Sequence, residues 1–260
     1  MTGRRWWMVA LLVAGCSGLE GPVAVPVAIL RVFVQGGDAG QFLGRPEATF
    51  ANAAAPEFPD SRLPSNLCQL ADILNLPIGT VDNLDAGDSI AFDTDAGTTY
   101  LYPKLDLAGN EAYSPATSFV SVNPGSAVTF RIPGASGGFP AVTFTALTAP
   151  PITQLSHIPT SVLASDSVVV TWAPVGDDSS TVEVALQWAT EASAIVSRQL
   201  LCQWKDDGRG VIAGAQLSEW ITATIRRIEV SRYRTVQQDL EGGGLLYFLA
   251  TYDTVPEPSQ

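Results

Sequence analysis

The chain has 260 residues but a single histidine, His157. A Ser-His-Asp triad needs a histidine base beside its serine and carboxylate, and no Gly-x-Ser-x-Gly elbow is present to carry the serine. One histidine and three cysteines without paired spacing do not make a zinc site. No Gly-x-x-x-x-Gly-Lys-Ser/Thr phosphate loop occurs either. We therefore predict no catalytic residue and no resident cofactor, and a surface or capping role for His157.

Basic residues are also scarce, with 14 Lys and Arg against 26 Asp and Glu, a formal net charge of −12. Neutralisation of phosphates dominates the affinity of proteins for nucleic acids, so this balance argues against a nucleic-acid partner. It also argues against attachment to anionic lipids by charge. The acidity is explained most simply by solubility.

Long hydrophobic runs are absent apart from a short one, Trp6 to Val13, that follows Arg4 and Arg5. It is shorter than the roughly 20 residues that cross a bilayer core. A basic start, a brief apolar stretch and small residues are typical of an export signal. The alternatives are an ordinary cleaved signal beside a chance cysteine, and an uncleaved anchor.

The residues Val13-Ala14-Gly15-Cys16 at the end of this run resemble the lipobox of bacterial lipoproteins. The resemblance implies that residues 1–15 are removed and that Cys16 is acylated. Each buried methylene contributes about 0.8 kcal/mol, so several acyl chains would hold the protein on the membrane. Ser17, in place of Asp, implies sorting to the outer membrane by analogy with enterobacterial lipoproteins. We therefore predict a lipid-anchored protein of the bacterial cell envelope.

Two further cysteines remain, Cys68 and Cys202. In an oxidising compartment they are candidates for a disulfide. The alternative is two buried free thiols that act as small hydrophobic side chains.

Short apolar, β-branched segments separated by Gly, Pro and Asp turns predict a mostly β protein with little helix. We expect a lipidated linker over residues 16–27, a β-rich N-terminal domain over 28–149, a β-sandwich over 150–255 and a tail over 256–260. Ala149-Pro150-Pro151 marks the expected boundary. Whether the two halves form one domain or two is left open.

The segment Asp166-Ser-Val-Val-Val-Thr-Trp-Ala-Pro174 resembles the second strand of fibronectin type III or immunoglobulin-like domains, with Trp172 in the core. Thr181 to Leu186 resembles the next strand. The residues at 213–221 depart from the family, and we expect one or two helical turns there. Cys202 to Gly208 also looks like a stretch in uncharacterised bacterial lipoproteins. The resemblance implies a sandwich, which hosts many unrelated functions.

Aspartates gather between Asp82 and Asp95, and Asp93-x-Asp95-x-Gly97 resembles the start of a calcium loop. The third ligand of such a loop and its closing glutamate are missing. Asp93 and Asp95 are therefore weak calcium candidates, with a turn-forming role as the alternative.

Arg226, Arg227, Arg232 and Arg234 form the only basic cluster, and on a strand Arg226, Arg232 and Arg234 share one face. Such arginines suit an acidic envelope partner through bidentate carboxylate pairing. The alternative is a charged edge strand that resists aggregation.

Aromatic residues suggest a sugar-stacking surface, since Trp and Tyr combine an apolar face with a polar tip. The candidates are Trp188, Trp204, Trp220, Tyr100, Tyr102 and Tyr113; the alternative is that they pack in the core. We predict a non-catalytic binding or interaction role, with a surface glycan-binding module as one alternative. A hydrolase that uses two distant carboxylates is another.

Overall fold

The computed structural model describes residues 24–36, 41–54, 66–72, 82–105, 111–156, 158, 166–177, 179–189 and 197–254. The expected signal over 1–15, Cys16 with Ser17, His157 and the tail over 256–260 lie outside the described residues. The described chain is almost entirely β, with one 3-10 turn and one short α-helix, which confirms the predicted fold class. No helix in these ranges is both long and apolar enough to cross a membrane.

Sixteen strands are described in two groups. The first comprises β1 (Ala24–Gly36), β2 (Phe42–Ala54), β3 (Leu67–Asp72), β4 (Asp82–Asn83), β5 (Ile90–Thr94), β6 (Gly97–Leu105), β7 (Glu111–Pro115), β8 (Val120–Ser121), β9 (Ala127–Ile132) and β10 (Val142–Leu147). The second comprises β11 (Val168–Thr171), β12 (Ser180–Trp188), β13 (Arg198–Lys205), β14 (Arg209–Ile212), β15 (Arg226–Asp239) and β16 (Leu245–Thr254). Between β14 and β15 lie the 3-10 turn over Gly214–Leu217 and α1 (Ser218–Thr222), at the place where helical turns were predicted.

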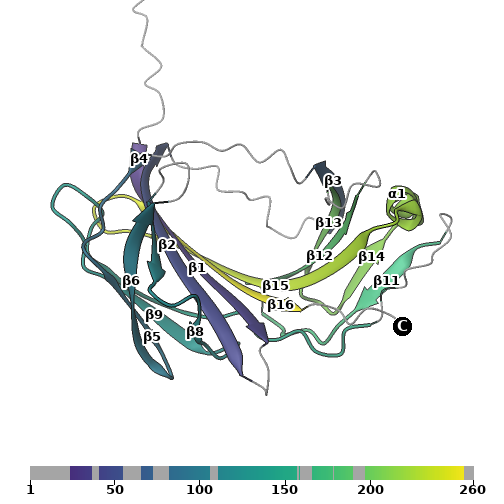
Figure 1. Cartoon of the computed structure of the whole chain (residues 1–260), viewed down its shortest axis with the longest axis horizontal. Helices are drawn as coiled ribbons and strands as arrows, with labels where there is room; N and C mark the ends of the chain where they lie inside the picture. Colours follow the sequence, from purple (N-terminus) through teal and green to yellow (C-terminus); the bar gives the residue numbers. More distant parts are fainter. Residues whose placement is uncertain are drawn as a thin grey trace, which may run out of the picture.

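One large sheet contains fourteen of these strands, in the order β10-β9-β5-β6-β7-β2-β1-β16-β15-β12-β13-β3, with β4 and β8 paired to β2. β1 runs parallel to β16 at its centre, and the other pairs are antiparallel. The long central strands curve between two lobes (Figure 1). The remaining strands, β11 and β14, pair only with each other.

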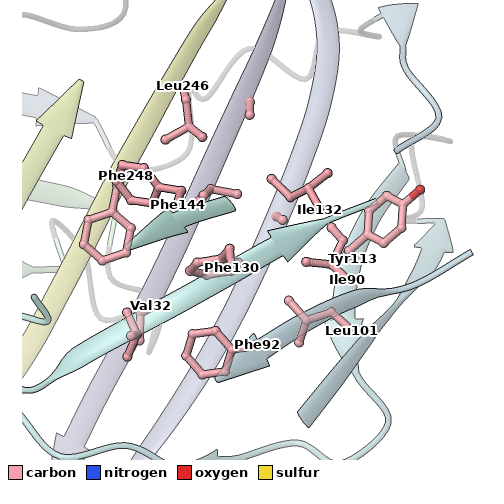
Figure 2. Packing of buried hydrophobic residues seen from close by; sticks show 14 of the residues in the cluster. Val32, Ile90, Phe92, Leu101, Tyr113, Phe130, Ile132, Phe144, Leu246 and Phe248 are labelled. Atoms are coloured by element: carbon pink, nitrogen blue, oxygen red, sulfur yellow. The ribbon is translucent and has the colours of Figure 1, made fainter. Parts of the chain in front are cut away.

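The first lobe has an aromatic core. Phe92 on β5, Phe130 on β9, Phe144 on β10 and Phe248 on β16 are all buried. Their rings point toward a common interior (Figure 2), with ring centroids 5.5 Å apart for Phe144 and Phe248. Because β10 and β16 are distant in the strand order, these contacts show that the sheet bends back on itself around this core.

The second lobe is a two-layered β-sandwich. Val170 on β11 and Ile212 on β14 share a core with Val184 on β12 and Cys202 on β13. In an immunoglobulin-like sandwich, strands B and E lie in one sheet and C, F and G in the other. Here β11 pairs with β14, while β13, β12, β15 and β16 follow one another in the large sheet. With β11 as the second strand and β12 as the next, this order agrees with the expected arrangement, and Trp172 is buried as predicted.

One predicted boundary needs correction, and the predicted division at residue 150 separates the cores but not the sheet. The linker was expected to extend to residue 27, but β1 begins at Ala24 and pairs with β2 from its first residue. The division at residue 150 separates the two cores, because Ala149 belongs to the first and Ile152 to the second. Neither half forms its core alone, however. Residues of β16, from the second half, complete the first core, and Cys68, from the first half, packs against the second core. The hydrogen-bonded sheet runs through both halves.

Candidate binding surface

The arginine cluster is not a surface for an acidic partner, because two of its members are buried. Arg232 is 1% exposed and Arg234 is 8% exposed. Their strand, β15, is flanked by β12 and β16, so the alternative of a charged edge strand is also wrong. Arg226 is exposed and places its guanidinium 5.2 Å from the ring centroid of Trp220.

The buried arginines instead hold the chain that passes between the two cores. Arg232 donates from Nη1 to the Pro151 carbonyl at 2.6 Å and from Nη2 to the Ala173 carbonyl at 2.7 Å. Its Nε lies 2.9 Å from Oδ2 of Asp206. Arg234 donates to the Thr148 carbonyl at 3.0 Å and pairs with Asp177. A guanidinium group has five N–H donors and can bond to several carbonyl oxygens at once. This accounts for the buried position of the two arginines better than an external ligand does.

A sugar-stacking surface built on tryptophans is also wrong. Trp188 and Trp220 are 1% exposed and Trp204 is 4% exposed. Tyr113 is buried as well, and its Oη donates to the Gly87 carbonyl at 2.9 Å. Burial raises the pKa of Tyr113. These four side chains belong to the cores.

Tyr100 and Tyr102 are different, with 51% and 46% of their surface exposed. Both lie on β6, on either side of the buried Leu101. Strand residues at i and i+2 point to the same face, so the two tyrosines occupy the outer face of the first lobe, away from the aromatic core. We call this outer face of β5, β6, β7, β9 and β10 the tyrosine face.

Each of these tyrosines has a small side chain opposite it in the sheet. Ala91 on β5 is paired with Tyr100, and Ser114 on β7 is paired with Tyr102. Aromatic residues on sheets normally gain stability from aromatic or β-branched neighbours. Small neighbours leave part of each ring uncovered, which is consistent with the exposure of the two tyrosines.

A row of polar side chains crosses four strands beside the tyrosines. Thr98, Asp93, Thr129 and Thr145 follow one another across β6, β5, β9 and β10. Thr98 donates to Asp93 at 2.6 Å, and the hydroxyls of Thr129 and Thr145 are 2.8 Å apart. Across three strand spacings the row is about 14 Å long. Sequence reasoning identified the two tyrosines but missed this row, whose members come from separate hairpins.

The weak calcium candidates are bonded to protein partners. Oδ1 of Asp93 lies 2.8 Å from Nη2 of Arg131, and Asp95 accepts a hydrogen bond from Asn123. A cation partner already balances the Asp93 charge, which leaves less reason for a metal ion there. No group of three or more metal-ligating side chains gathers in the described ranges.

Cys68 and Cys202 are joined by a disulfide. They face each other in the register of β3 and β13, and Cys202 is fully buried. The other large apolar side chains of β3, Leu67 and Leu70, are 59% and 51% exposed. Beside the backbone pairing with β13, the disulfide is therefore the main link of the described β3 side chains to the second core.

Two described carboxyl groups have displaced pKa values. For Asp177, burial alone would raise the pKa, but hydrogen bonds from Ser179 and Arg234 outweigh it and lower the pKa to about 2. For Asp253, burial raises the pKa, and a hydrogen bond from Ser231 partly opposes it. Their partners Arg234 and Ser231 are three residues apart on β15 and so lie on opposite sheet faces. These two carboxyls do not form the pair that the hydrolase alternative requires.

No family model matches the chain, and no curated protein matches it. Among solved structures it resembles the crystal structure of the FN1–FN3 domains of chicken CNTN1, with 14% sequence identity and a TM-score of 0.25. That match covers 90% of this chain and 68% of the other. At this TM-score the match does not establish a shared architecture. The fold assignment rests on the strand pairing described above.

Proposed function

We propose that this chain is a lipoprotein of the bacterial cell envelope, anchored in the outer membrane through acylated Cys16, with a non-catalytic binding or interaction role. The observation that carries the anchoring is the sequence Val13-Ala14-Gly15-Cys16 after a basic and apolar start. The disulfide between Cys68 and Cys202 supports export, because disulfides persist in oxidising compartments.

The binding role is supported by how the polar groups are used. The buried arginines and the Asp206 carboxylate bond to the protein itself, at the junction of the cores. Exposed side chains of the type that contacts ligands are instead presented on the tyrosine face, on strands of the large sheet. Rigid elements hold a binding surface more precisely than loops do.

The anchoring is tested by expressing the full chain and its Cys16→Ser variant in a bacterial host with labelled palmitate. We expect label and membrane association in the wild type, and neither in the variant. Intact-mass measurement should place the mature N-terminus at Cys16. An unlabelled wild-type chain cleaved at another position would overturn the proposal.

The interaction role is tested by cross-linking the lipidated protein in native membranes, with Cys16→Ser as the untethered control. One stoichiometric envelope protein, lost in the control, would establish a protein partner. Absence of any protein partner would favour a glycan or small ligand.

A further inference from the structure

We propose that the tyrosine face binds a neutral, extended β-linked polysaccharide, with Tyr100 and Tyr102 stacking against consecutive sugar rings. This inference rests on the proposed binding role and supplies its surface and ligand class. It does not depend on the lipid anchor, since the face belongs to the folded first lobe.

The first step concerns the rings. Tyr100 and Tyr102 are two residues apart on a strand, which separates them by about 7 Å along the chain direction. Both are about half exposed, and each faces Ala91 or Ser114 across the sheet. The strand thus presents two partly exposed aromatic side chains in succession on one face. The apolar C–H face of a sugar ring packs on such a surface while its hydroxyls remain free to hydrogen bond.

The second step concerns hydrogen bonding. Next to Tyr100 across the sheet are Ala91, then Arg131, then Thr143. The Arg131 side chain is 52% exposed. Within the described residues one of its nitrogens, Nη2, is bonded, and its partner is Asp93. A guanidinium has five donors and a threonine hydroxyl both donates and accepts. The surface therefore offers both kinds of partner that a sugar hydroxyl needs.

The third step concerns charge. The chain carries a formal net charge of −12, yet on these rows the only charged side chains, Asp93 and Arg131, neutralise each other. Lys104, two residues beyond Tyr102 on the same face, adds one positive charge outside these rows and donates to the Pro115 carbonyl at 2.8 Å. Rows without net charge in an acidic protein suit a neutral ligand better than an anionic or a basic one.

The fourth step concerns a protein partner as occupant. Protein hot spots are enriched in Trp, Tyr and Arg, so the tyrosines and Arg131 by themselves do not separate a protein from a glycan. The rest of the two rows does, because Ala91 is their one aliphatic side chain and four threonines and Asp93 supply hydroxyl and carboxylate oxygens. The exposed Leu147 lies two residues beyond Thr145 on β10, outside these rows. This polar composition favours a hydroxylated ligand.

The test uses native gel electrophoresis with and without hydroxyethyl cellulose, a neutral β-linked glucan, followed by titration with cellohexaose. Both the detergent-solubilised wild type and the full chain with Cys16→Ser are measured. We expect retardation of both, since binding is independent of the anchor. Tyr100→Ala and Tyr102→Ala should each weaken binding about tenfold, the loss of about one aromatic contact.

Tyr100→Phe keeps the ring and should retain most of the binding, while Val169→Ala is a matched control on an exposed site of β11. Circular dichroism shows whether each variant is folded. The proposal is overturned if the wild type is not retarded, or if the Tyr100→Ala/Tyr102→Ala double variant is folded and binds as the wild type does. It is also overturned if the cross-linked partner is a protein whose capture requires the two tyrosines. A loss of labelling at Cys16 with binding intact would overturn the anchoring alone.

Discussion

Arg232 and Asp206 form an ion pair that is closed off from water between the two cores, with their side chains 1% and 0% exposed. Trp172 donates from Nε1 to the same carboxylate at 2.7 Å. The pair thus connects β15, the turn after β13 and the tryptophan that follows β11. Through Pro151 it also holds the segment that joins the two halves of the chain.

Replacing Arg232 alone should be costly, because it leaves the Asp206 charge buried without a counter-charge. For Arg232→Leu we expect the free energy of unfolding in urea to fall by about 3–5 kcal/mol. The control is Arg227→Leu on the same strand, whose side chain is 60% exposed and pairs with Glu229; it should cost less than about 1 kcal/mol. Adding Asp206→Leu to Arg232→Leu should restore part of the loss. Equal losses for Arg232→Leu and the control would contradict this account.

The disulfide should stabilise the protein mainly through the unfolded chain. Cys68 and Cys202 are 134 residues apart, so the bridge closes a long loop. The loop-entropy model gives about 4–5 kcal/mol for a loop of this order, as an upper value. The Cys68→Ser/Cys202→Ser variant and the reduced wild type should show the same lowered urea midpoint.

Hydrogen exchange adds a local test of the same link. Amides of β3 should lose protection on reduction more than those of β12, because β3 has few buried side chains of its own. An unchanged midpoint after complete reduction would show that the bridge contributes nothing.

Stability should fall in acid through Asp177. Its pKa is about 2 in the folded protein against 3.8 for an unperturbed aspartate, so between these values the unfolded chain binds more protons. The stabilisation is therefore complete above about pH 5 and is lost as the pH falls toward 2. We expect Asp177→Asn to be less stable than the wild type at pH 6 and equal to it near pH 2, in urea unfolding at each pH. Glu241→Gln, at an exposed turn, is the control, and a pH-independent difference for Asp177→Asn would refute the assignment.

Gly210 on β14 is required by the close approach of Trp204. A Cβ at this position would lie 2.4 Å from the indole Cδ2, so the ring must move. Overpacking of this kind typically costs about 1–3 kcal/mol, and Gly210→Ala should also change the near-ultraviolet dichroism of the tryptophans. In Gly36→Ala the new Cβ would have one neighbour within 4 Å, the Tyr252 hydroxyl at 3.9 Å. Stability should then change little, and a similar loss in both variants would remove the explanation.

Local sequence patterns predicted many of the strands. Alternation of apolar and polar residues over Ala127–Ile132 and Thr181–Trp188 predicts β9 and β12, because a core-facing strand side takes an apolar residue at every second position. β9 buries one face, whereas β12 is buried on both faces. The turn residues over Asp93–Gly97 also predict the hairpin of β5 and β6, although Asp93, Thr94 and Gly97 are themselves paired strand residues. β3 was missed, since Leu67–Asp72 has no such alternation and is paired through its disulfide and its register with β13.

By itself, the sequence determined the β class, the position of many strands and the core place of Trp172, but not the exposure of Tyr100 and Tyr102. These properties depend on side-chain periodicity and turn residues within short segments. Only the tertiary structure decided that Arg232 and Arg234 are buried, that three tryptophans pack in the second core, and that one sheet joins both halves. The reason is that pairing between distant strands chooses which residues meet, as when β1 runs beside β16 and brings opposite ends of the chain into one core.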